Sequence, residues 1–223
     1  MKVLGVNASP RKKESNTLHL VHAVLQGAEK EGAETEIVDL YTLRIEYCTA
    51  CQTCYATGEC NLVDDFPALF DKMMQADGIV LGSPNYIDSV TAPMKAAFDR
   101  LADAIHCRML TGKYGCSVCT AGGSGQDDVV KYMNHVIGSL GAIIVGGIGV
   151  AVGRDPAALD RAEKQGVDLG RRLAQSIRGE IQYAEQEEQQ KKRREYFCQL
   201  VQWNKARWVH EYEWYVQMGW IKE

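Results

Sequence analysis

Residues 2–28 read KVLGVNASPRKKESNTLHLVHAVLQGA, and this stretch contains the unit that decides the fold. The apolar run Val3–Ala8 predicts a buried β-strand. Beyond a polar loop, apolar residues recur at helical spacing, at Leu18, Val21, Leu25 and Ala28. The sequence therefore predicts a strand that leads through a polar loop into an amphipathic helix.

The same alternation of apolar runs and helical patterns continues along the chain. Further strands are expected at Glu36–Leu40, Gly78–Gly82, Tyr114–Thr120 and Ala142–Val150. A helix is expected at about Phe66–Gln75. Another has Pro93 in its first turn and an apolar stripe of Met94, Ala97, Phe98, Leu101 and Ile105. A third carries Val129, Met133, Ile137 and Leu140 and ends at Gly141. The last opens at Asp155-Pro156 and carries Leu159, Ala162, Leu169 and Leu173.

Strands that are apolar almost throughout and are separated by helices indicate a parallel sheet covered on both faces. Five such strands suit an α/β fold of the flavodoxin-like type, with a doubly wound five-stranded parallel sheet. In these sheets, ligands bind beyond the carboxyl ends of the strands, where the strand order reverses. Candidate site residues are therefore expected in the loops after the first, third and fourth strands.

Composition narrows the class of protein. The 223 residues are 46% hydrophobic and 24% charged, as in globular domains, and the net charge of −4 argues against a nucleic-acid partner. The most apolar run, Ala142–Val152, is too short to span a membrane. Met1 leads directly into KVLGVNAS, without the basic and apolar regions of a signal peptide. We therefore expect a cytoplasmic protein with no membrane partner.

The C-terminal extension, residues 179–223, differs in character from the expected sheet domain of residues 1–178. It contains the charge run EQEEQQKKRR at 185–194 and all four tryptophans. One helical face is expected to carry Phe197, Leu200, Val201, Trp208, Tyr212 and Tyr215. Three interpretations stay open for this helical, aromatic-rich segment: packing on the chain's own sheet domain, a subunit interface, and a lid over the ligand pocket.

The loop after the first strand gathers hydroxyls, an amide and a guanidinium where a helix begins. These groups belong to Ser9, Arg11, Ser15, Asn16 and Thr17. A helix N-terminus exposes unpaired N–H groups, so the combination suits a phosphate monoester. The motifs of P-loop NTPases and dinucleotide-binding Rossmann folds are both missing from the sequence. Simple helix capping by Ser15 or Asn16 is the alternative.

The loops after the third and fourth strands read GSPNYID at 82–88 and TAGGSG at 120–125. Tyr86 offers a flat aromatic face beside backbone amides, which suits a planar heterocycle. The glycines of the second loop allow close approach of the backbone to a ligand. Each loop taken alone is equally consistent with an ordinary turn.

Together, SPR and SNT in the first loop, GSPNY followed by TAPMKAAFDR, and the glycine loop resemble the NADPH-dependent FMN reductase branch of the flavodoxin-like proteins. The resemblance covers about residues 1–178. It implies that FMN binds and that the first loop, with Ser9, Arg11, Ser15, Asn16 and Thr17, holds its phosphate. It further implies that Pro84, Asn85, Tyr86 and Ile87 line the flavin ring, opposite Thr120, Ala121, Gly122 and Gly123.

Four cysteines follow the second strand within the loop 44–63, as Cys48-x2-Cys51-x2-Cys54-x5-Cys60. Ferredoxins begin their iron–sulfur motif with the same spacing, so we expect a [4Fe–4S] cluster. Zinc or a metal-free thiol loop are the alternatives. The spacing resembles the iron–sulfur flavoprotein subfamily. That resemblance implies a cluster near the flavin of a neighbouring subunit, within a homodimer or homotetramer.

The remaining cysteines and the histidines do not form a recognisable ligand motif. Cys116 and Cys119 lie three apart on a predicted strand and should face opposite sides of the sheet. Cys107 and Cys198 are interpreted as packing residues. The five histidines show no ligand spacing.

These features predict an FMN-dependent oxidoreductase or electron-transfer flavoprotein. It would pass electrons between NAD(P)H or ferredoxin, FMN and the cluster to a small acceptor such as a quinone, a nitro compound, a metal ion or an oxygen species. The cofactors carry the chemistry, so no catalytic side chain is assigned. Two alternatives stay open: an NAD(P)H-dependent FMN reductase without a cluster, and a non-enzymatic redox or zinc-binding interaction module.

Overall fold

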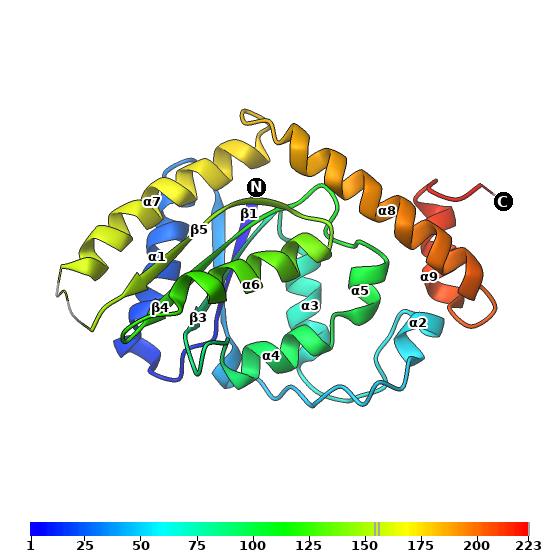
Figure 1. The fold of residues 1–223 in the computed structure, drawn as a ribbon, viewed down its shortest axis with the longest axis horizontal. Coiled ribbons are helices and arrows are strands. Elements are labelled where there is room, and N and C mark those ends of the chain that lie inside the picture. The colour runs from blue at the N-terminus through cyan, green and yellow to red at the C-terminus, as the bar shows by residue number, and fades with distance from the viewer. Residues whose placement is uncertain (154, 156, 223) are drawn as a thin grey trace.

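The computed structural model describes residues 1–153, 155 and 157–222. A five-stranded sheet in the order β2-β1-β3-β4-β5 forms the centre of the molecule, with every neighbouring pair parallel (Figure 1). The strands are β1 (Lys2–Asn7), β2 (Glu34–Asp39), β3 (Gly78–Pro84), β4 (Tyr114–Ala121) and β5 (Ile143–Ala151). The predicted flavodoxin-like α/β fold is confirmed. The strand order reverses between β1 and β3, which is where such sheets bind ligands.

Helices cover both faces of the sheet. One face packs against α1 (Asn16–Glu29) and α7 (Ala158–Ile177). The opposite face packs against α3 (Phe66–Gln75), α4 (Ala92–Asp99), α5 (Ala102–His106) and α6 (Gln126–Ser139). Two short 3-10 helices follow β1 and β2, at Lys12–Glu14 and Leu40–Thr42. Of the Asp155-Pro156 pair predicted to open α7, Pro156 lies outside the described residues.

Glycines allow α1 and α7 to pack closely. A Cβ on Gly27 would collide with the carbonyl oxygen of Val167, and one on Gly170 would collide with that of Val24. The two helix backbones therefore touch directly, and no side chain separates them.

The prediction of one helix from Pro93 through Ile105 is wrong, because the structure has two helices there. α4 ends at Asp99 and α5 begins at Ala102. Leu101 has non-helical backbone angles, and Arg100 turns its side chain inward to pair with Asp64. The apolar stripe misled the prediction because Leu101 and Ile105 pack on the same core as Met94 and Phe98, although the helix is interrupted between Asp99 and Ala102.

The C-terminal extension forms two helices, α8 (Ala184–Asn204) and α9 (Val209–Gln217). The single helical face predicted across 197–215 is therefore wrong. The chain turns between Asn204 and Trp208, and aromatic residues from both helices pack together around Val201 and Tyr215. Among the described helices, none is long and apolar enough to cross a lipid bilayer.

Helix α8 packs against the beginning of β5, at the free edge of the sheet. The side-chain amide of Gln186 accepts a hydrogen bond from the Ile144 backbone N–H and donates one to the Ile144 carbonyl, both at 2.9 Å. Gln190 donates to the carbonyls of Gly138 and Ala142 at 3.0 and 2.9 Å. The Gln186 amide thus bonds Ile144 much as a neighbouring strand would, and Gln190 joins α8 to the end of α6 and to the residue before β5.

Candidate functional site

The structure brings the three predicted ligand loops together at the carboxyl edge of the sheet. The hydroxyls of Thr17 and Thr120 are hydrogen-bonded at 2.7 Å, which joins the first loop to the end of β4. The backbone N–H of Asn85 donates to the Thr120 carbonyl at 2.8 Å. Its side-chain amide donates to the Ser124 carbonyl at 2.7 Å. Residues more than a hundred positions apart thus meet at one place, which we call the three-loop site.

The first loop combines helix capping with an exposed cation. Ser15 caps α1, and its hydroxyl accepts a hydrogen bond from the Leu18 N–H at 3.0 Å, so the capping interpretation is confirmed for Ser15. Ser9, Ser15 and Thr17 are buried, Asn16 is half-buried and Arg11 is exposed. The first loop therefore carries an exposed arginine beside the positive end of the α1 dipole, a combination that suits an anion.

The second loop makes an unusually tight turn. Tyr86 and Ser89 form an antiparallel bridge, and the two residues between them, Ile87 and Asp88, have φ angles of 52° and 56°. Left-handed backbone is costly for a β-branched residue such as isoleucine. The turn leaves the Ile87 side chain fully exposed and Tyr86 about half exposed. Both side chains are thus available to a ligand or a partner.

The third loop leaves room beside the first two. A Cβ built on Gly122 or Gly123 would meet no atom within 4 Å. Thr120 and Ala121 are buried, and the Ala121 carbonyl accepts a hydrogen bond from the Val152 N–H at 2.9 Å. Open space thus lies over the two glycines while their neighbours are held in the sheet.

The three-loop site suits a planar group that carries hydrogen-bond donors. Within the described part of the chain, the Asn85 side-chain oxygen is buried without a hydrogen-bond partner. A buried acceptor in this state calls for a donor from a ligand. The imide N–H of a flavin ring is such a donor, so the residues present fit FMN.

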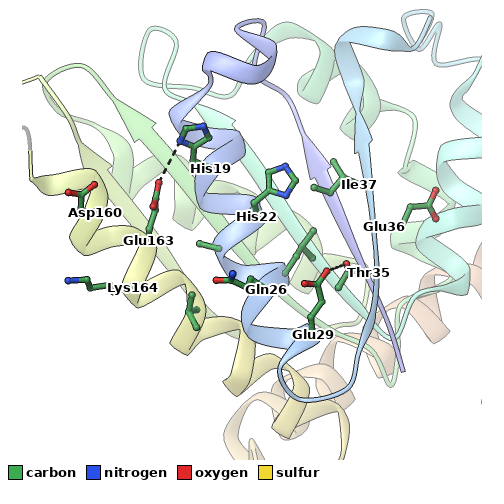
Figure 2. A pocket seen from close by; sticks show the side chains of 13 residues that line it. His19, His22, Gln26, Glu29, Thr35, Glu36, Ile37, Asp160, Glu163 and Lys164 are labelled. Carbon is green, nitrogen blue, oxygen red and sulfur yellow. Dashed lines mark hydrogen bonds and ion pairs between the residues drawn. The ribbon is translucent and has the colours of Figure 1, made fainter.

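A separate groove of about 830 Å³ runs between α1, α7 and β2 (Figure 2). His19 and Glu163 face each other across it, with a nitrogen–oxygen distance of 3.6 Å. Both side chains are well exposed, so their attraction is weak. The residues that line this groove include none of the predicted FMN ligands.

The cysteine loop ends in a pocket beside α3 and α5. Cys54 and Cys60 line a cavity of about 430 Å³ together with Arg100 and Asp103. Burial raises the pKa of the Cys54 thiol to about 11.

Cys48 and Cys51 stay exposed at the outer part of this loop. A hydrogen bond from the Thr53 hydroxyl, at 3.3 Å, lowers the pKa of Cys51. Thiolates are the ligands of iron–sulfur clusters. Cys54 and Cys60 line the cavity, and Cys48 and Cys51 are exposed on the same loop, so the chemistry of the four side chains fits such a group.

Asp64 and Arg100 close the end of the cysteine loop as a buried ion pair. Arg100 donates to the two Asp64 carboxylate oxygens at 2.5 and 3.3 Å and to the Glu46 carbonyl at 3.0 Å. Its guanidinium also lies 4.7 Å from the centre of the Phe66 ring. The pair ties both ends of the loop to α4.

Sequence reasoning missed a polar cluster between α5 and α9. His210 contacts the Asp103 carboxylate at 3.2 Å, and Cys107 lies 3.9 Å from the same carboxylate. Glu211 is completely buried and contacts His106 at 2.9 Å. His210 and Asp103, like Glu211 and His106, lie more than a hundred residues apart in the chain, so no local spacing signals these contacts.

The interpretation of Cys116 and Cys119 as buried packing residues is confirmed. Both side chains are fully buried, Cys116 in the core beneath α1 and α7 and Cys119 in the core of the opposite face. Cys107 is also fully buried, although its neighbours are polar.

Comparison with known proteins identifies relatives along most of the chain. The model of the NADPH-dependent FMN reductase family matches residues 1–157. An "Iron-sulfur flavoprotein" of Archaeoglobus fulgidus is 37% identical over 181 residues, which cover 79% of this chain and 80% of the relative. Another, of Methanocaldococcus jannaschii, is 31% identical over 194 residues, which cover 80% of this chain and 98% of the relative.

Solved structures show the same fold. An NAD(P)H:quinone oxidoreductase from Methanothermobacter marburgensis superimposes with a TM-score of 0.64 over 82% of this chain and 98% of its own, at 19% identity. A flavodoxin from the Archaea superimposes with a TM-score of 0.54 at 18% identity, over 80% of this chain and 99% of its own. At these identities the likeness concerns the fold alone. On the extent of the sequence matches, the chain belongs to the NADPH-dependent FMN reductase family, beside the iron–sulfur flavoproteins, and is an FMN-dependent oxidoreductase.

Proposed function

We propose that this flavoprotein passes electrons between NAD(P)H or ferredoxin, FMN and a [4Fe–4S] cluster, and delivers them to a small acceptor. The observation that carries the proposal is the meeting of three loops at the carboxyl edge of the sheet, together with a second loop region whose Cys54 and Cys60 line a cavity. The relatives named iron–sulfur flavoproteins support it. A quinone, a nitro compound, a metal ion or an oxygen species would serve as the acceptor.

Bound FMN exchanges either a hydride or single electrons, whereas an iron–sulfur cluster exchanges one electron at a time. The protein's part is to hold these groups. Arg11 and the N–H groups at the start of α1 would bind the FMN phosphate. Asn85 would accept a hydrogen bond from the ring, and Tyr86 and Ile87 would cover it opposite Gly122 and Gly123. Cys48, Cys51, Cys54 and Cys60 would ligate the cluster.

The arrangement of the chain favours an assembly of more than one copy. The loop that leads from β4 to α6 lies at the left of the molecule, and α2 (Thr53–Thr57), which carries Cys54, lies at the right (Figure 1). A separation seen in projection is a lower limit on the true separation, so the two proposed cofactor sites of one chain lie apart. A homodimer or homotetramer in which the cysteine loop of one copy faces the three-loop site of another would bring them together.

An anaerobic spectrum with quantitation of flavin, iron and sulfide tests the proposal. We expect FMN and a broad iron–sulfur absorbance in the same protein, with four irons for each set of four cysteines. Protein that stays colourless after anaerobic reconstitution with FMN would refute the flavin site. Zinc without iron would instead support the interaction module.

The electron donor and the role of the cluster need separate measurements. Rapid bleaching on anaerobic mixing with NADPH supports the reductase, and bleaching only by reduced ferredoxin supports the electron carrier. A variant in which Cys48, Cys51, Cys54 and Cys60 are all Ser should keep FMN and lose electron delivery to the acceptor. Unchanged activity in that variant would favour an FMN reductase without a cluster.

A further inference from the structure

The C-terminal extension packs on the loop that carries the cysteines. Helix α2 (Thr53–Thr57), which follows Cys51 and contains Cys54, lies against α9 at the right of the molecule (Figure 1). We propose that Trp208 and His210 are positioning residues of the cysteine site, which hold α2, and with it Cys54, against α5. Only the iron-release measurement described below depends on the proposed function, because it needs a bound cluster.

Aromatic contacts fix one side of α2. The Tyr55 ring stacks on the His106 imidazole, with centroids 4.8 Å apart, and meets the Trp208 ring edge-on at 5.2 Å. Trp208 also lies 5.1 Å from His106. The residue next to Cys54 is thus held in a cluster of rings supplied by α2, α5 and the extension.

A close contact fixes the C-terminal end of α2. Gly58, which ends the helix with a φ of 78°, lies so near the His210 ring that a Cβ built on it would come within 2.7 Å of the imidazole. The same His210 contacts Asp103, which lines the cavity beside Cys54 and Cys60. One side chain of α9 therefore touches both the helix that carries Cys54 and the wall of the cavity.

The extension itself is anchored to α5, so it can serve as a fixed support. Glu211 contacts His106, and the Tyr215 hydroxyl donates to the His106 carbonyl at 2.9 Å. Glu211 and Tyr215 are completely buried. A further hydrogen bond, from Arg207 to Gln52 at 3.4 Å, reaches the residue just before α2.

Position-resolved alkylation of the thiols in FMN-loaded, iron-free protein tests the proposal without depending on the cluster. The variants are Trp208→Ala and His210→Ala, with Trp203→Ala and His135→Ala as matched controls, because Trp203 is 84% exposed on α8 and His135 is exposed on α6. We expect alkylation of Cys54 to be about 3- to 10-fold faster in the first pair, since local opening exposes its thiol. Alkylation of the exposed Cys48 should stay unchanged.

Iron release to a chelator from reconstituted protein gives the second measurement, and it should accelerate in the same two variants. Trp208→Phe keeps a ring against Tyr55 and should behave like the unaltered protein.

Cys54 alkylation in the Trp208→Ala and His210→Ala variants at the same rate as in the controls would overturn the proposal. Loss of FMN together with faster alkylation of Cys116, which is buried in the sheet, would also overturn it, because the change would then be global unfolding. A wild-type protein that binds FMN but assembles no cluster would refute the [4Fe–4S] cluster of the proposed function. The alkylation rates would still decide whether Trp208 and His210 position Cys54.

Discussion

The Asp64–Arg100 ion pair shows how two single residues contribute to the stability of the fold. Both side chains are almost fully buried, although two charges in a protein interior are costly unless they are paired and hydrogen-bonded. Asp64 meets this condition, because it also accepts hydrogen bonds from the backbone N–H groups of Glu46 and Phe66 at 2.7 and 3.1 Å.

The variant Asp64→Asn is expected to destabilise the protein by about 3–5 kcal/mol, since it leaves the Arg100 charge buried without a counter-charge. Urea unfolding at pH 7 measures the loss. Asp99→Asn is the control, because the Lys95–Asp99 pair is about half exposed and should contribute only about 0.3–0.5 kcal/mol. Equal losses in the two variants would contradict the assignment.

The same carboxylate predicts a pH dependence. Burial by itself would raise the pKa of Asp64, but hydrogen bonds from Arg100 and from the backbone outweigh burial and lower it. A lowered pKa stabilises the fold above the unfolded-state value of about 3.9, and this contribution disappears as the pH falls through the folded-state pKa. The stability difference between wild type and Asp64→Asn should therefore shrink below about pH 4. A difference that stays constant down to pH 2 would exclude this origin.

At the scale of elements, the edge of β5 depends on a helix for its protection. Gln186 on α8 bonds both backbone groups of Ile144. Replacing it by Ala leaves these groups without partners, so Gln186→Ala should lose about 1–3 kcal/mol and aggregate more readily on warming. Chemical unfolding and light scattering measure the two effects. Gln189→Ala, an exposed neighbour on the same helix, should change neither.

The contact between α1 and α7 predicts a contrast between two helical glycines. A methyl group at Gly170 would strike the Val24 carbonyl, whereas one at Gly138 on α6 would meet only Ile144 at 3.7 Å. Gly170→Ala should therefore cost about 1–3 kcal/mol by overpacking. Gly138→Ala should be neutral or slightly stabilising, because Ala favours helix over Gly. Thermal unfolding of both variants measures this contrast, and equal Tm values for the two variants would contradict it.

At the scale of the whole molecule, the three-loop site connects cofactor binding to stability. Ligands that bind only the folded state stabilise it, by about 2.7 kcal/mol at a free concentration of 100 Kd. For a chain of this size, FMN at that excess should raise Tm by about 5–10 °C. Riboflavin lacks the phosphate and should raise Tm far less at the same concentration, because Arg11 and the start of α1 would have no anion to bind. Equal increases in Tm with FMN and with riboflavin would contradict a phosphate site at Arg11 and the start of α1.

Much of the molecule was predictable because its signals are local. The five apolar runs predicted the strands, and the loops after β1, β3 and β4 had to meet, since carboxyl ends of parallel strands share one edge. The cysteine spacing likewise lies within thirteen consecutive residues. Strand periodicity also predicted the opposite placement of Cys116 and Cys119.

What the tertiary structure alone decided concerns contacts between distant residues. The break between α4 and α5 follows from Arg100 turning toward Asp64, and the contacts of α9 with α2 join positions about 150 residues apart. Helical periodicity reports which side chains are apolar, but it carries no information on which distant partner a buried charge, amide or imidazole meets. The sequence thus determined the sheet and its ligand edge through local pattern, while folding determined what surrounds the cysteines through long-range pairing.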